Sequence, residues 1–273
     1  MEGAAAVAVE CPAGAGMQIH SSPPRTVPDA AMLERSLELV AFPFADAVSH
    51  DAPAIDVHPR ERYESVSRAV NILISLAALI ILSPILLLIA LAVKLTSHGP
   101  ILYTQIRVGI DRRRQTSLDD ERRVYDLGGA PFTMYKFRTM HVNAESDGKA
   151  VWAVRQDPRV TLVGRVLRRC RLDELPQLYN VLRGDMNIVG PRPERPALFA
   201  DLCAGIPHYR LRQRVKPGIT GWAQINQPYD ACVDDVRRKV QYDLEYLRRQ
   251  SLIEDLRIMT MTLPVMLFGQ KGW

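Results

Sequence analysis

The chain has 273 residues, of which 47% are hydrophobic and 24% are charged, as is ordinary for a globular protein. This length allows one sizeable domain plus appendages. The formal net charge of +5 is modest, so it does not by itself indicate a nucleic-acid partner; anionic lipid headgroups or a phosphorylated substrate fit it equally well. The four cysteines are widely scattered. Their spacing excludes a compact zinc motif and predicts reduced thiols in a protein that faces the cytosol.

Residues 1–60 are rich in Ala, Pro, Gly and Ser. The first residues lack the basic start and long apolar run of a secretory signal peptide. We predict a mostly disordered N-terminal tail over 1–60, with a transient helix in "MLERSLELVAF". We expect this tail to carry no chemistry.

Residues 61–97 form a predicted membrane segment. About 25 residues between Arg68 and Lys94 carry no charge, which is long enough for a helix to span a bilayer. A buried core helix is seldom so uniformly apolar over this length. The composition therefore favours the membrane over a soluble core.

Ser83 and Pro84 lie near the middle of this segment. Pro84 has no N–H, and its ring clashes with the carbonyl of Ile80, so a kink is expected. Each half is then roughly 15–20 Å long at about 1.5 Å per residue, less than the roughly 30 Å of hydrocarbon. Basic residues flank both ends, and positive charge prefers the cytoplasmic side. We favour a re-entrant helix–break–helix, with a single kinked crossing as the alternative.

Residues 98–273 are predicted to form a cytosolic α+β domain that is mostly helical. The stretches "SHGPILYTQIRVG" and "FTMYKFRTM" read as strands of a small β-hairpin, and 111–127 between them as an exposed insertion of mixed charge. "RVTLVGRVLRRCRLDELPQLYNVLRG" is helical in pattern with an interruption at Pro176. "NIVGPRPERP" and "VKPGITGWAQIN" read as loops. Two amphipathic helices follow, and we expect the last to lie in the membrane interface.

Asp173 and Glu174 are adjacent and stand among arginines. Neighbours on a helix point about 100° apart, so these acids do not face each other as a proton-sharing pair would. They can instead divide the work: one carboxylate attacks a phosphorus, and the other holds Mg²⁺. Adjacent acids are also common on solvated helix faces, so the pair alone does not decide the matter.

Further charged residues are candidates for binding a phosphorylated substrate. They stand on predicted strands, turns and rigid loops rather than in one run, which suits a shaped phosphate pocket better than a surface that binds a duplex. We therefore expect no nucleic-acid partner. The candidates are Lys136, Arg138, Asp157, Arg159, Arg171, Arg192, Arg214 and Lys216.

From about residue 62 to 268 the chain resembles the bacterial sugar transferases, which are monotopic polyprenyl-phosphate phosphoglycosyltransferases. The matching strings are "SPILLLIALAVKLTSHGPILYTQIRVG", "FTMYKFRTM", "DPRVTLVGRVLRRCRLDELPQLYNVLRGDMNIVGPRPE" and "VKPGITGWAQIN". They cover nearly everything beyond the tail, and together they are highly specific.

The resemblance implies transfer of a sugar 1-phosphate from a nucleotide diphosphate sugar, expected to be a UDP-sugar, to polyprenyl (undecaprenyl) phosphate. It implies that Asp173 attacks the sugar-bearing phosphorus, that Glu174 binds Mg²⁺, and that the membrane helix is re-entrant and broken at Ser83 and Pro84. It places the protein at the cytosolic face of the bacterial inner membrane, with the bilayer as a partner and a homodimer as the candidate assembly.

Two features depart from the family pattern. The family commonly has Asp early in the membrane helix, where this chain has Asn71; this puts in doubt any polar lock that depends on the carboxylate. The insertion at 111–127 is longer than expected and either contacts a partner or is decoration. A membrane-anchored binder without activity and an idle scaffold for polysaccharide enzymes are the alternatives to an enzyme.

Overall fold

A computed structural model describes residues 19–20, 64–111, 129–142, 144, 149–150, 157–227 and 233–268. The helices and strands that follow one another along these residues are β1 (Ile19–His20), α2 (Glu64–Ile81), α3 (Ser83–Thr96), β2 (Leu102–Val108), β3 (Pro131–Phe137), β4 (Lys149–Ala150), α4 (Leu162–Arg169), η1 (Leu172–Glu174), α5 (Gln177–Arg183), β5 (Asn187–Val189), α6 (Pro196–Gly205), η2 (Tyr209–Arg214), β6 (Gly218–Thr220), α7 (Trp222–Asn226), α8 (Val233–Arg249) and α9 (Leu252–Phe268).

The described part of the chain is mostly helical, with a small β component, which confirms the predicted fold class. β2 and β3 form an antiparallel hairpin whose register runs from Leu102 opposite Phe137 to Val108 opposite Pro131. β5 and β6 form a short parallel pair, and β1 pairs with β4. The tail apart from 19–20, including the helix predicted in "MLERSLELVAF", and the insertion beyond Asp111 lie outside the described residues.

Two local predictions were wrong. The stretches predicted as loops around the Gly-Pro and Pro-Gly motifs contain β5 and β6, and the second stretch also contains the five-residue helix α7; these elements are too short to show a periodic pattern. The segment predicted as one helix interrupted at Pro176 is also broken at Cys170 and Arg171, so that η1 stands between α4 and α5. Sequence periodicity did not indicate this earlier break, because arginines are tolerated in helices and in turns alike.

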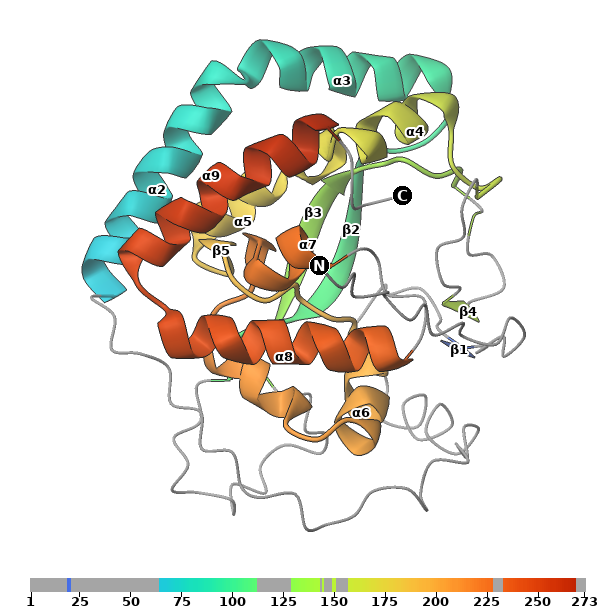
Figure 1. Cartoon of the computed structure of the whole chain (residues 1–273). Helices are drawn as coiled ribbons and strands as arrows, with labels where there is room; N and C mark the ends of the chain where they lie inside the picture. The colour runs from blue at the N-terminus through green and yellow to red at the C-terminus, as the bar shows by residue number, and fades with distance from the viewer. Residues whose placement is uncertain are drawn as a thin grey trace, which may run out of the picture.

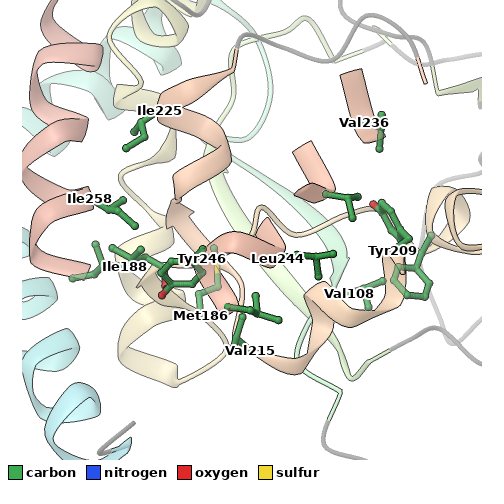
Figure 2. Packing of buried hydrophobic residues seen from close by; sticks show 14 of the residues in the cluster. Val108, Met186, Ile188, Tyr209, Val215, Ile225, Val236, Leu244, Tyr246 and Ile258 are labelled. Carbon is green, nitrogen blue, oxygen red and sulfur yellow. The ribbon is translucent and has the colours of Figure 1, made fainter. Parts of the chain in front are cut away.

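The hydrophobic core lies between the hairpin, the β5–β6 pair and the C-terminal helices. Figure 2 shows residues from widely separated elements meeting there, among them Val108 from β2, Met186 and Ile188 near β5, and Tyr246 and Ile258 from α8 and α9. A second, smaller cluster of buried residues joins α3 to α4. The helix predicted at 234–249 is confirmed as α8, and the one predicted at 252–273 is confirmed as α9 up to Phe268, beyond which the chain lies outside the described residues; both helices cover this core (Figure 1).

α2 and α3 meet at a sharp bend and form the outer edge of the molecule in Figure 1. The break falls at Leu82, directly before Ser83 and Pro84. Pro84 cannot donate to the carbonyl of Ile80, and the hydroxyl of Ser83 donates to it instead, at 2.8 Å. The Ser-Pro pair thus ends one helix and starts the next without leaving that carbonyl unpaired.

α2 has the reverse of the usual amphipathic pattern. Its buried residues are the polar Ser67, Asn71 and Ser75, which are spaced four apart and so lie on one face. Large apolar side chains are exposed on the rest of α2 and on α3: Val66, Leu73, Leu76, Ile80, Ile81, Ile85, Leu87, Leu88, Leu91 and Leu95. By length and composition, α2 is also the one described helix able to cross a membrane. A helix with polar residues inside and apolar residues outside is suited to lipid rather than to water.

Two polar side chains fasten α2 to the rest of the fold. The Oδ1 of Asn71 accepts a hydrogen bond from the backbone N–H of Ile188 at 2.8 Å, and its Nδ2 donates to the carbonyl of Ser67 at 2.8 Å. Arg68 donates to the carbonyls of Val181 and Leu182 at the end of α5. Asn71 therefore fastens the helix without a carboxylate, and both the oxygen and the nitrogen of its amide make hydrogen bonds.

We expect Asn71→Ala to lower the free energy of unfolding by about 1–3 kcal/mol, because the buried N–H of Ile188 loses its acceptor. Ser75→Ala is the matched control: Ser75 is buried on the same face of α2, but its hydroxyl has no partner among the described residues. Thermal unfolding of the detergent-solubilised protein measures both. Equal melting temperatures for the two variants would contradict a role for Asn71 as the lock.

Candidate active site

Asp173 and Glu174 lie in η1, a 3₁₀ turn rather than the α-helix assumed from the sequence. Arg171, at the start of this turn, has a φ of 56°, a left-handed conformation that residues other than glycine seldom adopt. The chain therefore changes direction after α4. Only 7% of Asp173 and 5% of Glu174 are exposed. This placement excludes the solvated helix face as the explanation of the acidic pair.

Cationic side chains from two other segments hold the carboxylate of Glu174. Its Oε1 accepts from Nζ of Lys136 at 2.8 Å and from Nη2 of Arg192 at 2.7 Å. Nη1 of Arg171 lies 4.0 Å from Oε2. Burial by itself raises the pKa of Glu174, but the charges of Arg192 and Lys136 outweigh burial and hold this pKa well below its ordinary value. Glu174 is therefore ionised.

Asp173 has a different environment. Within the described part of the chain, no hydrogen bond to its carboxylate is found. Burial raises the pKa of Asp173, and the negative charge of Glu174 raises it further; the charges of Lys136, Arg168 and Arg192 act in the opposite direction without cancelling these effects. The two neighbouring acids thus divide into one that is held by cations and one that is left reactive.

The hairpin strand β3 is fixed to the acidic turn through Asn180. This fully buried residue of α5 accepts from the backbone N–H of Tyr135 at 3.1 Å and donates to the carbonyl of Thr133 at 2.7 Å. Its side chain therefore pairs with the edge of β3 in the way a neighbouring strand would. This fixes Lys136, the next residue along β3 after Tyr135, relative to Glu174, which lies in η1 just before α5 begins.

Asp157 and Arg159 bind each other. The Nη2 of Arg159 lies 2.6 Å from Oδ2 of Asp157, and the backbone and Nε of Arg159 donate to the same carboxylate. The hydrogen bonds from Arg159 lower the pKa of Asp157. The charge of Arg168 lowers the pKa of both Asp157 and Asp173, and its Nε donates to the hydroxyl of Thr139 at 3.0 Å.

The structure places the other predicted residues farther from Glu174. Arg138 is buried and donates to the carbonyls of Ser97 and His98, both at 2.7 Å, where it fastens the end of α3. Gly99 has a φ of +120°, and a side chain there would collide with this guanidinium. Lys216 lies near Gly184, at the opposite end of α5 from Glu174. Arg214 is half-buried at the end of η2.

Sequence reasoning missed two residues beside the acidic turn and a buried cluster of charges that supports the neighbouring loop. Arg168 and Asn180 were not among the candidates. Neither was a buried charged cluster under the Gly-Pro-Arg-Pro loop, formed by Glu194, Arg212, Lys239 and Asp243. The sequence holds 35 lysines and arginines, and their density gives no ranking. Arg212, in η2, can be recognised as part of this cluster only from its contacts with Asp243 and Glu194, which are distant in the sequence.

The donor atoms suit magnesium only in part. Among the described residues no group of three or more His, Cys, Asp or Glu side chains converges. The carboxylates of Asp173 and Glu174 are hard oxygen donors, and Mg²⁺ is commonly held by one or two carboxylates together with waters and substrate phosphates. One of these carboxylates is already paired with cations. The residues therefore fit a magnesium ion that substrate phosphates help to hold, and they do not form a complete protein cage.

The sequence also matches known proteins over this same region. Residues 62–269 match the bacterial sugar transferase family. This range holds the broken apolar helix, the hairpin and the acidic turn, and the chain belongs to that family.

Three relatives show the range of names within the family. A "UDP-N-acetylgalactosamine-undecaprenyl-phosphate N-acetylgalactosaminephosphotransferase" from Aeromonas hydrophila is 39% identical over 77% of this chain and 46% of its own length. Proteins called "UDP-glucose:undecaprenyl-phosphate glucose-1-phosphate transferase" are 43% identical in Escherichia coli K12, over 72% of this chain and 39% of the relative, and 40% identical in Caulobacter vibrioides, over 79% and 74%. The chain spans less than half the length of the first two.

The contrast between the two acids predicts opposite effects on stability. The pKa of Asp173 is higher in the folded protein than in the unfolded chain. Ionisation of Asp173 therefore lowers the free energy of unfolding as the pH rises from the unfolded-state pKa to the folded-state pKa, and this loss persists at higher pH. Asp173→Asn is therefore expected to raise the melting temperature at pH 8, and the gain should shrink as the pH falls toward the unfolded-state pKa of about 3.9.

Glu174→Gln serves as the matched comparison. Because the pKa of Glu174 is lower in the folded protein, its ionised carboxylate stabilises the fold at pH values above its unfolded-state pKa of about 4.3. This stabilisation is lost as the pH falls through the folded-state pKa. Removing this partner of a buried ion pair should cost about 3–5 kcal/mol at neutral pH. Differential scanning fluorimetry between pH 5 and 8 measures both variants. A destabilised Asp173→Asn would contradict the assignment of Asp173 as the unneutralised acid.

Proposed function

We propose that the protein transfers a sugar 1-phosphate from a UDP-sugar to undecaprenyl phosphate through a covalent phosphosugar-aspartate intermediate. The observation that carries this proposal is the division of labour in η1. Asp173 is buried beside several cations and accepts no hydrogen bond among the described residues, whereas Glu174 forms ion pairs with Lys136 and Arg192. A nucleophile needs this combination of reactive oxygen and nearby positive charge.

The reaction has two steps. A carboxylate oxygen of Asp173 attacks the phosphorus that bears the sugar; a P–O bond forms, and the bond to the nucleoside monophosphate breaks with its electron pair on the leaving phosphate. An oxygen of undecaprenyl phosphate then attacks the same phosphorus and frees the aspartate. Lys136, Arg168 and Arg192 would offset the negative charge of the phosphates. The names of the relatives support undecaprenyl phosphate as acceptor and a sugar phosphate as the transferred group.

Magnesium is part of the proposal. Glu174 would hold Mg²⁺ together with the diphosphate of the substrate. When bound, the ion would neutralise charge on the phosphate oxygens. For Glu174 to take this role, Lys136 and Arg192 must turn part of their contacts from its Oε1 to the phosphates. The predicted absence of nucleic acid and the homodimer stay predictions.

The apolar helices suggest where the reaction takes place. We propose that α2 and α3 form a re-entrant hairpin in the cytosolic face of the bacterial inner membrane. The support is the exposed apolar surface of both helices, the polar buried face of α2 and the break at Ser83 and Pro84. α3 has 14 residues, which gives a length of about 21 Å, less than the roughly 30 Å needed to cross. This placement would present Asp173 to a lipid phosphate at the membrane surface and to a soluble nucleotide sugar.

The reaction is tested by incubating solubilised protein with undecaprenyl phosphate and a panel of UDP-sugars, and by measuring UMP release. We expect Mg²⁺-dependent release that EDTA abolishes. Asp173→Asn should reduce it at least a thousandfold, because an amide cannot form the acyl phosphate. Mass spectrometry of wild-type protein incubated with the UDP-sugar alone should detect a phosphosugar on Asp173. An active Asp173→Asn variant would exclude the covalent route, and absence of UMP release with every sugar would favour a binder or a scaffold.

The topology is tested by cysteine labelling of intact cells with a membrane-impermeant thiol reagent, in a background without native cysteines. Probes at Glu64 and His98 report the two ends of the apolar segment. His98 is preferable to Ser97, whose side chain accepts a hydrogen bond from Arg138. A probe at the exposed Arg249 on α8 is the reference for the catalytic domain. All three should react only after the cells are opened; labelling at Glu64 alone from outside would establish a full crossing.

A further inference from the structure

The loop that carries Arg192 is held at every carbonyl from Pro191 to Glu194. The carbonyl of Pro191 accepts from the N–H of Gly218 at 2.9 Å, and that of Glu194 accepts from the N–H of Val108 at 2.9 Å. Between them, side chains replace backbone donors: Nη2 of Arg212 donates to the carbonyl of Arg192 at 3.1 Å, and Nη1 of Arg107 to that of Pro193 at 2.9 Å. The loop therefore lacks the freedom that its position between elements would otherwise give it.

Arg212 is itself held in a closed set of contacts. Its side chain is 1% exposed. Its Nε and Nη2 lie 2.9 and 2.8 Å from Oδ2 of Asp243 on α8, and its Nη1 donates to the hydroxyl of Tyr209 at 2.7 Å and lies 3.4 Å from Oε1 of Glu194. A guanidinium with this many partners has little room to move, because any rotation breaks several buried hydrogen bonds at once.

These contacts form a continuous connection from α8 to the acidic turn. Asp243 fixes Arg212, Arg212 fixes the backbone of Arg192, and the guanidinium of Arg192 meets Glu174 at 2.7 Å. No proposed step of the reaction uses Arg212. Burying a charged pair of this kind is costly, and hydrophobic residues of similar size often stabilise a fold at least as well. Stability alone therefore does not explain why an ion pair occupies this position.

We infer that Arg212 is a positioning residue, which sets the backbone of Arg192 so that its guanidinium reaches Glu174 and the substrate phosphates. This inference rests on the proposed function and adds a residue to it. Displacing a catalytic group by about 1 Å can cost about 100-fold in rate. Loss of the contact to the carbonyl of Arg192 should therefore reduce turnover by no more than the removal of the Arg192 side chain does.

The experiment is a double-mutant cycle. Arg212→Lys keeps a positive charge opposite Asp243 but cannot reproduce the planar set of donors. We expect it to lower kcat about 10- to 100-fold in the wild-type background and less than about twofold when Arg192 is already Ala. An equal factor in both backgrounds would mean that Arg212 acts on the fold in general, and would overturn the inference.

Lys239→Met is the matched control. Lys239 lies on α8 and donates to Oε1 of Glu194 at 2.9 Å, so it belongs to the same buried cluster but binds a side chain rather than the loop backbone. Its activity should stay within about threefold of wild type; a loss equal to that of Arg212→Lys would overturn the inference. If Arg212→Lys does not fold, the double variant Arg212→Gln with Asp243→Asn, which leaves no buried charge unpaired, is judged by the same criteria.

A readout without turnover separates this inference from the proposed function. The interaction between Arg192 and Glu174 is measured as a coupling in melting temperature, from Arg192→Ala, Glu174→Gln and the double variant. Arg212→Lys should remove most of that coupling, whereas Lys239→Met should leave it. If no UDP-sugar gives UMP release but the coupling behaves in this way, the function fails and the positioning role stands. A coupling that survives Arg212→Lys would overturn the role.

Discussion

The structure depends on one buried carboxylate oxygen. Oε1 of Glu174 receives Lys136 from the hairpin and Arg192 from the loop after β5, so three segments far apart in the sequence meet at one atom. A buried charge is tolerated only when it is paired and hydrogen-bonded. This requirement fixes the distances between the hairpin, the acidic turn and the loop. Neighbouring elements hold these segments in place: Asn180 binds β3 to α5, and the β5–β6 pair holds the loop that carries Arg192.

The same oxygen determines the state of its neighbour. Because Lys136 and Arg192 bind Glu174, Asp173 stays buried without a hydrogen-bond partner among the described residues and beside a negative charge. A fold selected for stability alone would not keep such a group, since a neutral side chain would relieve both burial and repulsion. The left-handed backbone at Arg171 is a second cost at the same turn. Two unfavourable features within three residues mark this turn as a place where function outweighs stability.

The sequence predicted the parts whose pattern is local. The break at Ser83 and Pro84, the helices predicted at 234–249 and 252–273, and the choice of Asp173 and Glu174 as candidates each follow from a few adjacent residues. The 3₁₀ geometry of Asp173 and Glu174 could not be predicted, because the break at Arg171 depends on backbone strain that no composition signals. Arg138 and Arg192 appear equivalent in sequence, each within a short motif. Only their contacts in the structure distinguish them: Arg138 binds the backbone at the end of α3, whereas Arg192 binds Glu174 in the candidate active site.

The charges of the site indicate what it is built to receive. Four cations act on the acidic turn, namely Lys136, Arg168, Arg171 and Arg192, against the two carboxylates of Asp173 and Glu174. This leaves a surplus of two positive charges when both acids are ionised. The diphosphate of the proposed nucleotide sugar would bring two negative charges and the proposed Mg²⁺ two positive charges, so positive charge would still be in excess when both acids are ionised. In a buried setting, where unpaired charge is most costly, the phosphates would offer Lys136 and Arg192 new partners, and the excess of positive charge would favour the ionised form of Asp173 that can attack.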